Sequence, residues 1–94
     1  MRADFQLGPT VAFQRGLIIE CKWQDVGGSA DEKLPYLVAN IRERFPTPAI
    51  VIVDGHGMRA QAVEWLRRQV DGDRLVGVFD LGQFVSWLQR TLAP

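Results

Sequence analysis

Three charged residues in the first quarter of the chain, Asp4, Glu20 and Lys22, have types and a spacing that suit metal-dependent hydrolysis. Residues two apart on a β-strand project from the same face, so Glu20 and Lys22 point the same way while Cys21 points to the other face. Two carboxylates and an ammonium that converge suit a hard cation such as Mg²⁺, which prefers oxygen ligands. A water bound to such an ion can lose a proton near Lys22 and attack phosphorus. The pattern therefore predicts phosphodiester hydrolysis.

Asp4 meets Glu20 in only one of two strand pairings that the sequence allows. An antiparallel pair that turns midway between them, near residue 12, puts the two side chains opposite each other with Cβ atoms about 5 Å apart. Two tight hairpins, turning at Gly8-Pro9 and at Arg15-Gly16, would instead put them at opposite ends of the sheet. Taken alone, Glu-x-Lys more often marks the solvated end of a strand, so the predicted site depends on the first pairing.

The strands that would position these residues are short runs of branched apolar residues between turn signals. They are expected at Leu17 to Trp23, at Ala49 to Val53, where a continuous apolar run is typical of burial on both faces, and at Leu75 to Phe79. Alternation of strands and helices after residue 45 predicts parallel pairing through right-handed crossovers, whereas the first 23 residues predict an antiparallel hairpin. The fold class is therefore α/β, with a mixed β-sheet flanked by helices.

Three amphipathic helices complete this pattern, so that the order after the hairpin is helix, strand, helix, strand, helix. The first is expected over about 29 to 44, because Ser29 to Glu32 has the form of a capping box. Pro35 would then lie past its first turn, where it removes a helical hydrogen bond and kinks the helix. The second is expected over Ala60 to Val70, and the third follows a second capping signal at Asp80 to Gln83.

Length and charge limit the classes of function. The 94 residues allow one domain, residues 1–94, and the eleven Lys and Arg balance the eleven Asp and Glu. No bulk positive field therefore draws nucleic acid, and phosphate must meet a local site. The single cysteine excludes an intramolecular disulfide and a CxxC metal pair, which fits a reducing compartment. Without a signal-type start or an apolar run of about 18 residues, a cytoplasmic protein is expected.

Asp4 followed by Glu20-Cys21-Lys22 resembles the D…(D/E)-x-K core of the PD-(D/E)XK nuclease superfamily, the restriction-endonuclease-like fold. The Gly27-Gly28-Ser29 link and the segment 31–36 are similar to the stretch after this motif in type II restriction enzymes, so the resemblance covers roughly residues 2 to 70. It implies a metal-dependent endonuclease acting on DNA. Asp4, Glu20 and the backbone carbonyl of Cys21 would bind Mg²⁺, or Mn²⁺ as a substitute, and Lys22 would assist the nucleophilic water. Further contacts to the nucleic acid are expected from Gln24, Lys33 and Arg59.

The chain departs from the family pattern before the motif. Ala3 replaces the usual proline, a minor variation, and the helix and first strand that normally precede the aspartate strand are not seen ahead of Met1. The resemblance therefore implies a truncated nuclease domain, a sheet completed by a second copy or a partner chain, or an inactive module that binds nucleic acid or a protein. Elements that read base edges are not expected in 94 residues.

Other chemistry-bearing residues have more ordinary interpretations. His56, in the turn that follows Asp54, lies where α/β proteins often build sites, yet a loop role is commoner, and Asp54 lacks a second acidic partner at a recognisable spacing. Arg59, Arg67 and Arg68 form a basic edge on the helix after that loop. Such an edge is usually a solvated face, although it can also contact a nucleic-acid backbone.

Overall fold

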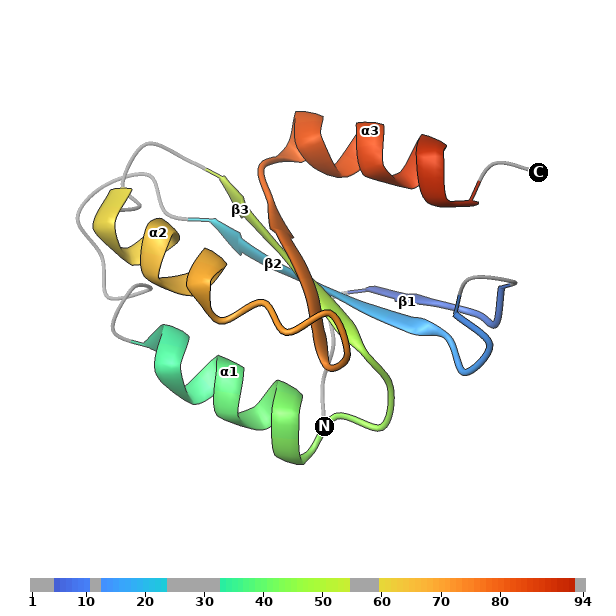
Figure 1. The fold of residues 1–94 in the computed structure, drawn as a ribbon, viewed down its shortest axis with the longest axis horizontal. Coiled ribbons are helices and arrows are strands. Elements are labelled where there is room, and N and C mark those ends of the chain that lie inside the picture. The colour runs from blue at the N-terminus through green and yellow to red at the C-terminus, as the bar shows by residue number, and fades with distance from the viewer. Residues whose placement is uncertain (1–4, 11–12, 24–32, 55–59, 93–94) are drawn as a thin grey trace.

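The computed structural model of the chain describes residues 5–10, 13–23, 33–54 and 60–92, which form a four-stranded mixed sheet with helices on both faces (Figure 1). In spatial order the strands are β1 (Phe5–Leu7), β2 (Leu17–Trp23), β3 (Ala49–Asp54) and β4 (Leu75–Phe79). β1 pairs with β2 in the antiparallel sense, whereas β2 with β3 and β3 with β4 are parallel. The predicted α/β class with a mixed sheet is confirmed.

The register of β1 on β2 is the one that turns midway near residue 12. Phe5 lies opposite Ile19, and Leu7 lies opposite Leu17. The direct pairing of these two strands contradicts the alternative with two tight hairpins. Gly16, at φ +93°, permits it, because a Cβ there would lie 2.7 Å from the carbonyl oxygen of Leu7. Asp4 itself lies outside the described residues.

The helices are α1 (Leu34–Glu43), α2 (Ala60–Arg68) and α3 (Leu81–Leu92). The predicted helix start at residue 29 is wrong, because α1 begins at Leu34 with Lys33 as its N-cap. Pro35 therefore lies in the first turn, where the N–H groups have no partner inside the helix and proline costs nothing, so the predicted kink is also wrong. The capping-box sequence at 29–32 lies outside the described residues.

The predicted cap of α3 is confirmed. The Gln83 N–H donates to Asp80 Oδ1 at 2.7 Å, and the Asp80 N–H donates to Gln83 Oε1 at 2.9 Å. This reciprocal pair satisfies two of the N–H groups that the start of a helix leaves without partners. The start of α3, and with it the end of β4, is fixed locally by these two residues.

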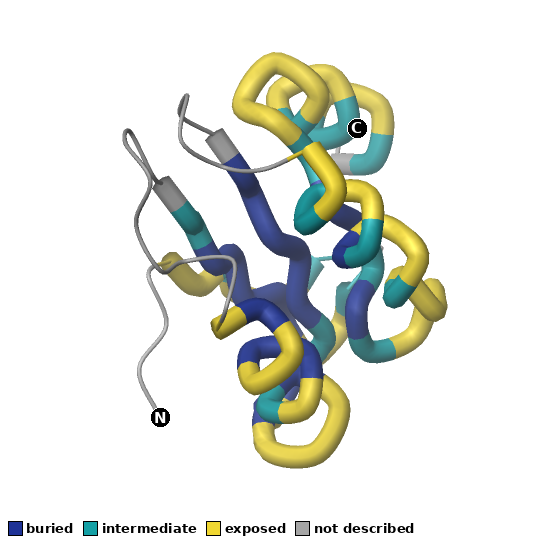
Figure 2. Tube along the Cα trace, turned by 90° about the vertical axis from the view of Figure 1, so that its left-hand side faces the viewer, coloured by how far each residue is buried: buried dark blue, intermediate teal, exposed yellow. Residues whose placement is uncertain are grey.

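The sheet separates two apolar layers. α1 and α2 pack on one face, through residues such as Leu37, Ile41 and Leu66, and α3 packs on the other through Trp87 (Figure 1). The described part of β3 is buried on both faces, as its apolar run predicts, and the exposed residues gather on the outer sides of the helices (Figure 2). None of the described helices has the length and apolar character needed to cross a membrane.

Candidate functional site

β2 directs Glu20 and Lys22 toward α1. Ile18, on the same face of the strand, packs in the layer under α1 and α2, whereas Ile19 packs in the layer under α3. Side chains alternate between the two faces of a strand, so Glu20 and Lys22 share the face of Ile18. Their proximity agrees with this, because Lys22 Nζ lies 3.9 Å from Glu20 Oε2.

The burial of these two side chains differs sharply. The Glu20 side chain is 7% exposed, whereas the Lys22 side chain is 35% exposed. Removing a carboxylate from water costs several kcal/mol unless charged or hydrogen-bonding partners compensate it, so glutamate is rarely this buried. At 3.9 Å the ammonium of Lys22 compensates the charge without forming a hydrogen bond. Its N–H groups are therefore able to serve another acceptor.

Glu20 and Lys22 line a cavity of about 590 Å³ between β2 and α1, called here the Glu20 cavity. The other wall is one face of α1 and the residues at its two ends. The residues of this wall recur every three or four positions, which is the spacing of a single helix face. They are Lys33, Tyr36, Leu37, Asn40, Arg44 and Phe45.

The Glu20 cavity carries more positive than negative groups. Lys22, Lys33 and Arg44 are its cationic side chains, and Glu20 is its carboxylate. Tyr36 lies at the rim, 67% exposed. Although the whole chain has no net charge, this arrangement attracts phosphate oxygens locally. A buried carboxylate beneath a basic rim can hold a cation and accept a phosphate beside it.

The structure brings together only some of the predicted site residues. Lys33 lines the same cavity as Glu20 and Lys22. The side chain of Cys21 packs in the layer under α3, on the opposite face of β2 as expected, whereas the predicted metal ligand is its backbone carbonyl. Within the described ranges, no cluster of three or more His, Cys, Asp or Glu side chains that could hold a metal ion is found. The predicted site residues outside the described part of the chain are Asp4, Gln24 and Arg59, and His56, for which a loop role was expected, lies outside it as well.

Asn40 and Arg44 were not among the predicted site residues. Both line the Glu20 cavity from α1. Their spacing from Lys33 and Tyr36 places all four on one side of a helix, and this signal was present in the sequence. What the sequence did not show is that this side of α1 faces β2, because that depends on how the helix rotates against the sheet.

Comparison with known proteins identifies a family for the chain. No curated protein and no solved structure matches the chain. A family model described as a PD-(D/E)XK nuclease superfamily domain matches residues 1–92, a longer stretch than the motif resemblance covered. The match includes β2, α1 and the whole Glu20 cavity, and it indicates a nuclease-type activity. The chain belongs to the PD-(D/E)XK nuclease superfamily.

Proposed function

We propose that the chain is a metal-dependent endonuclease that hydrolyses DNA phosphodiester bonds in the Glu20 cavity. The observation that carries the proposal is the buried carboxylate of Glu20, 3.9 Å from the Lys22 ammonium and beneath a basic rim. On a core strand, two charged side chains stabilise the fold no better than well-packed apolar side chains would. The arrangement is explained if the carboxylate holds a cation and the ammonium acts on the substrate.

Asp4 is proposed as the second carboxylate. The register of β1 on β2 supports this, since each pair of opposed residues has numbers that average to 12. One further step along the same register, beyond Phe5 opposite Ile19, leads to Asp4 and Glu20. Two carboxylates side by side repel each other unless a cation lies between them, which is the usual setting of a divalent metal ion.

The donor set of this proposed centre fits Mg²⁺, with Mn²⁺ as a substitute. Its donors are the carboxylates of Asp4 and Glu20 and the backbone carbonyl of Cys21, all of them oxygens, which hard cations prefer. When bound, the ion supplies Lewis-acid stabilisation of the negative charge that develops on the phosphate.

The remaining roles fall to side chains of the cavity. Lys22 orients the attacking water and moves a proton at Nζ, which an ammonium can do and a guanidinium cannot. Lys33 and Arg44 bind the phosphates that flank the scissile bond. Gln24 and Arg59 are proposed as further contacts to the nucleic acid.

The test is cleavage of supercoiled plasmid with Mg²⁺, comparing the unaltered chain with Glu20→Ala and Lys22→Ala. We expect each variant to lose about 10²-fold or more in rate, because each removes a group that acts on the transition state. Glu64→Ala is the matched control, since Glu64 is an exposed carboxylate that pairs with Arg68 on α2. Equal cutting by all four proteins would refute the proposal, and a parallel RNA substrate tests the preference for DNA.

A nuclease-like module without catalysis is the second candidate. The observation that favours it is that the described lining of the Glu20 cavity has three cationic side chains, Lys22, Lys33 and Arg44, which suit binding of phosphate without cleavage. Calorimetric titration with Mn²⁺ separates the two candidates. Tight uptake that Glu20→Ala abolishes supports the nuclease, whereas a chain that binds nucleic acid without any such uptake is a binding module.

Association through the β1 edge remains a prediction. β1 is the three-residue edge strand of the sheet, and Phe5 on it is 62% exposed. Unpaired edge strands are templates for pairing with a second copy or a partner chain. Light scattering at rising protein concentration should show a dimer mass, and a constant monomer mass would contradict the prediction.

A further inference from the structure

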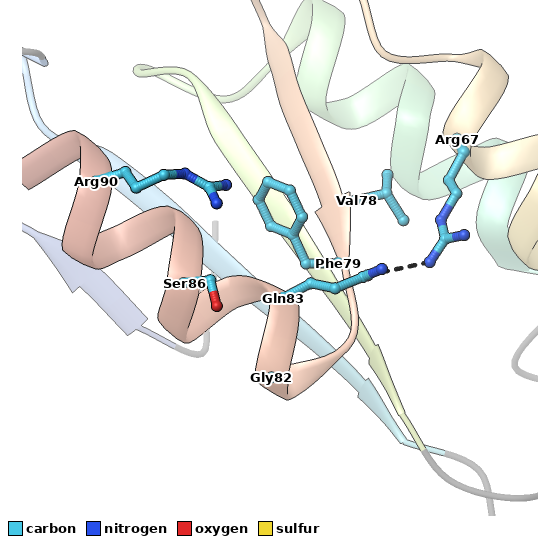
Figure 3. Close-up of a pocket in the computed structure, with 7 residues that line it drawn as sticks. All are labelled: Arg67, Val78, Phe79, Gly82, Gln83, Ser86 and Arg90. Carbon is cyan, nitrogen blue, oxygen red and sulfur yellow. Dashed lines mark hydrogen bonds between the residues drawn. The ribbon is translucent and has the colours of Figure 1, made fainter.

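A second cavity, of about 670 Å³, lies at the opposite edge of the sheet from β1. Arg67 reaches it from α2, Val78 and Phe79 come from β4, and the remaining residues come from α3 (Figure 3). Val78 and Phe79 project from opposite faces of β4, so the cavity lies along the outer edge of this strand. We call it the β4-edge cavity. Its lining residues are Arg67, Val78, Phe79, Gly82, Gln83, Ser86 and Arg90.

The charged groups of the β4-edge cavity are both arginines. Arg67 and Arg90 line it, and no lining residue is acidic. The neighbouring Arg68 pairs with Glu64 at 3.4 Å, whereas neither Arg67 nor Arg90 has an acidic partner within the part of the chain that the structure describes. Two guanidinium groups on one cavity repel each other, and an anion between them removes this repulsion.

Arg67 is already held in position for such an anion. Its Nη2 donates to Gln83 Oε1 at 3.2 Å, and the same oxygen accepts the N–H of Asp80 at 2.9 Å in the cap of α3. This contact uses one of the five N–H donors of the guanidinium, and no second acceptor for Arg67 is found among the described residues. Because this hydrogen bond restricts the side chain before a ligand arrives, less conformational entropy is lost on binding.

The α3 wall has the composition of an anion site. Gly82, Ser86 and Arg90 follow one another at intervals of four residues and therefore lie on one side of the helix. Together they offer a bare backbone, a hydroxyl and a guanidinium. Figure 3 shows Arg90 reaching from α3 toward the ring of Phe79, on the other side of the cavity from Arg67. Phe79 and Val78 add an apolar surface between the two arginines.

We propose that the β4-edge cavity binds a nucleotide phosphate, either free or within a nucleic-acid strand. Arg67 and Arg90 hold the phosphate oxygens, because the planar fork of a guanidinium matches phosphate with two parallel hydrogen bonds. The Ser86 hydroxyl donates a further bond, and the sugar or base lies against Phe79 and Val78. The cavity shares no residue with the Glu20 cavity, so this site does not depend on the proposed nuclease activity.

The test is a titration followed by NMR with EDTA present, so that no metal bridges the ligand to the chain. The probes are deoxyadenosine monophosphate and a short oligothymidine, each added to the unaltered chain and to Arg67→Gln, Arg90→Gln and Arg68→Gln. We expect Arg67→Gln and Arg90→Gln each to weaken binding about tenfold or more, the usual loss for a charge-assisted bond to phosphate. Arg68→Gln is the matched control, since it makes the same change one residue away.

The outcomes separate the sources of the phosphate. Saturable binding of the mononucleotide, with shifts at the Gly82 and Ser86 amides, supports a free nucleotide as the ligand. Oligothymidine binding at least tenfold tighter, with the same dependence on Arg67 and Arg90, supports a nucleic-acid strand. Absence of binding by both probes, or equal weakening by Arg68→Gln, overturns the proposal. Circular dichroism melts verify that the variants fold, and the result leaves the cleavage test of Glu20 untouched.

Discussion

The Glu20 cavity and the β4-edge cavity differ in the charges of the side chains that line them. In the Glu20 cavity the buried carboxylate of Glu20 lies on β2, an interior strand, beneath lysines and an arginine. In the β4-edge cavity two exposed arginines, one from α2 and one from α3, flank an edge strand, and no lining residue is acidic. A carboxylate in a low-dielectric setting can hold a cation, whereas arginines alone can only hold an anion. Chemistry is therefore expected at the first cavity and binding at the second.

The largest effect is expected when the lysine beside Glu20 is replaced by the other basic residue, arginine. Lys22→Arg keeps the positive charge beside Glu20 but removes the group that can give up a proton. We expect kcat for DNA cleavage to fall about 10²-fold, in the range usual for general acid–base groups. Unchanged calorimetric uptake of Mn²⁺ would show that Glu20 is still in place. A variant with the original kcat would contradict a proton-transfer role for Lys22.

The reciprocal exchange is Arg90→Lys in the β4-edge cavity. Lysine keeps the positive charge but lacks the planar guanidinium that makes two parallel hydrogen bonds to phosphate. We therefore expect the affinity for deoxyadenosine monophosphate to fall, though less than in Arg90→Gln. The same NMR titration measures it. An Arg90→Lys variant as weak as Arg90→Gln would mean that the fork alone holds the phosphate, and one as tight as the unaltered chain would mean that charge alone does.

Gly77→Ala should damage the β4 side of the molecule selectively. A Cβ at this buried glycine would lie 2.5 Å from Cζ of Phe79, whose ring also packs 5.6 Å from that of Trp87. The ring cannot move without losing that contact, so we expect a loss of about 1–3 kcal/mol in the free energy of unfolding, the usual cost of overpacking. Urea unfolding measures it. Gly8→Ala is the control, because open space surrounds that position, and equal stability of the two variants would contradict the packing argument.

Arg44→Gln tests whether the rim of the Glu20 cavity binds substrate without acting on it. Removing one contact to phosphate should weaken DNA binding about three- to tenfold and lower the slope of log K against log salt by about one. We expect KM to rise while kcat is retained. Fluorescence anisotropy at several salt concentrations measures the slope. Arg15→Gln, which removes an exposed arginine elsewhere, is the control, and the same slope in both variants would contradict a phosphate contact at Arg44.

The smallest expected effect concerns Asp71, which lies in the turn between α2 and β4. Arg42 on α1 lies 3.4 Å from Asp71 Oδ2, and Asp71 Oδ1 accepts the backbone N–H groups of Asp73, Arg74 and Leu75. Burial alone would raise the pKa of the Asp71 carboxyl. The three backbone hydrogen bonds and the charge of Arg42 outweigh it and lower the pKa below its ordinary value.

Asp71→Asn removes the charge and keeps an acceptor. The stability that the carboxylate contributes is present above the unfolded pKa of about 3.9 and is lost as the pH falls through the lower folded pKa. We expect a difference of less than about 1 kcal/mol at neutral pH, since the pair is partly exposed, and none in strong acid. Urea unfolding across this pH range measures it. A change in Mn²⁺ uptake or in nucleotide affinity would contradict the independence of the two cavities.

Local signals in the sequence predicted much of this fold. The bounds of β2 and β4 agree with their apolar runs, and the cap of α3 at Asp80 and Gln83 forms as its residue types predict. The start of α1 was mispredicted for a local reason as well. Ser29 to Glu32 resembles a capping box, and that signal outweighed the stronger one, which is that proline fits the first turn of a helix.

The cavities were harder to predict because they depend on non-local geometry. Glu20 and Lys22 were identified from the alternation of side chains on a strand. Asn40 and Arg44 could be recognised as lining residues only once it was known which side of α1 faces β2. The β4-edge cavity required the strand order as well. Only when β4 is known to be an edge do Arg67 and Arg90, 23 positions apart, come to face one another across it.

The side-chain oxygen of Gln83 links the start of α3 to the position of an arginine on α2. Because it accepts both the Asp80 N–H and Arg67, the first turn of α3 and the reach of an arginine from α2 depend on one atom. When the first turn of α3 opens locally, Arg67 loses its hydrogen bond to Gln83. When a ligand holds Arg67 in place, the amides of that turn become better protected from hydrogen exchange. The rate of hydrogen exchange at the Asp80 amide should therefore fall when a ligand holds the guanidinium of Arg67.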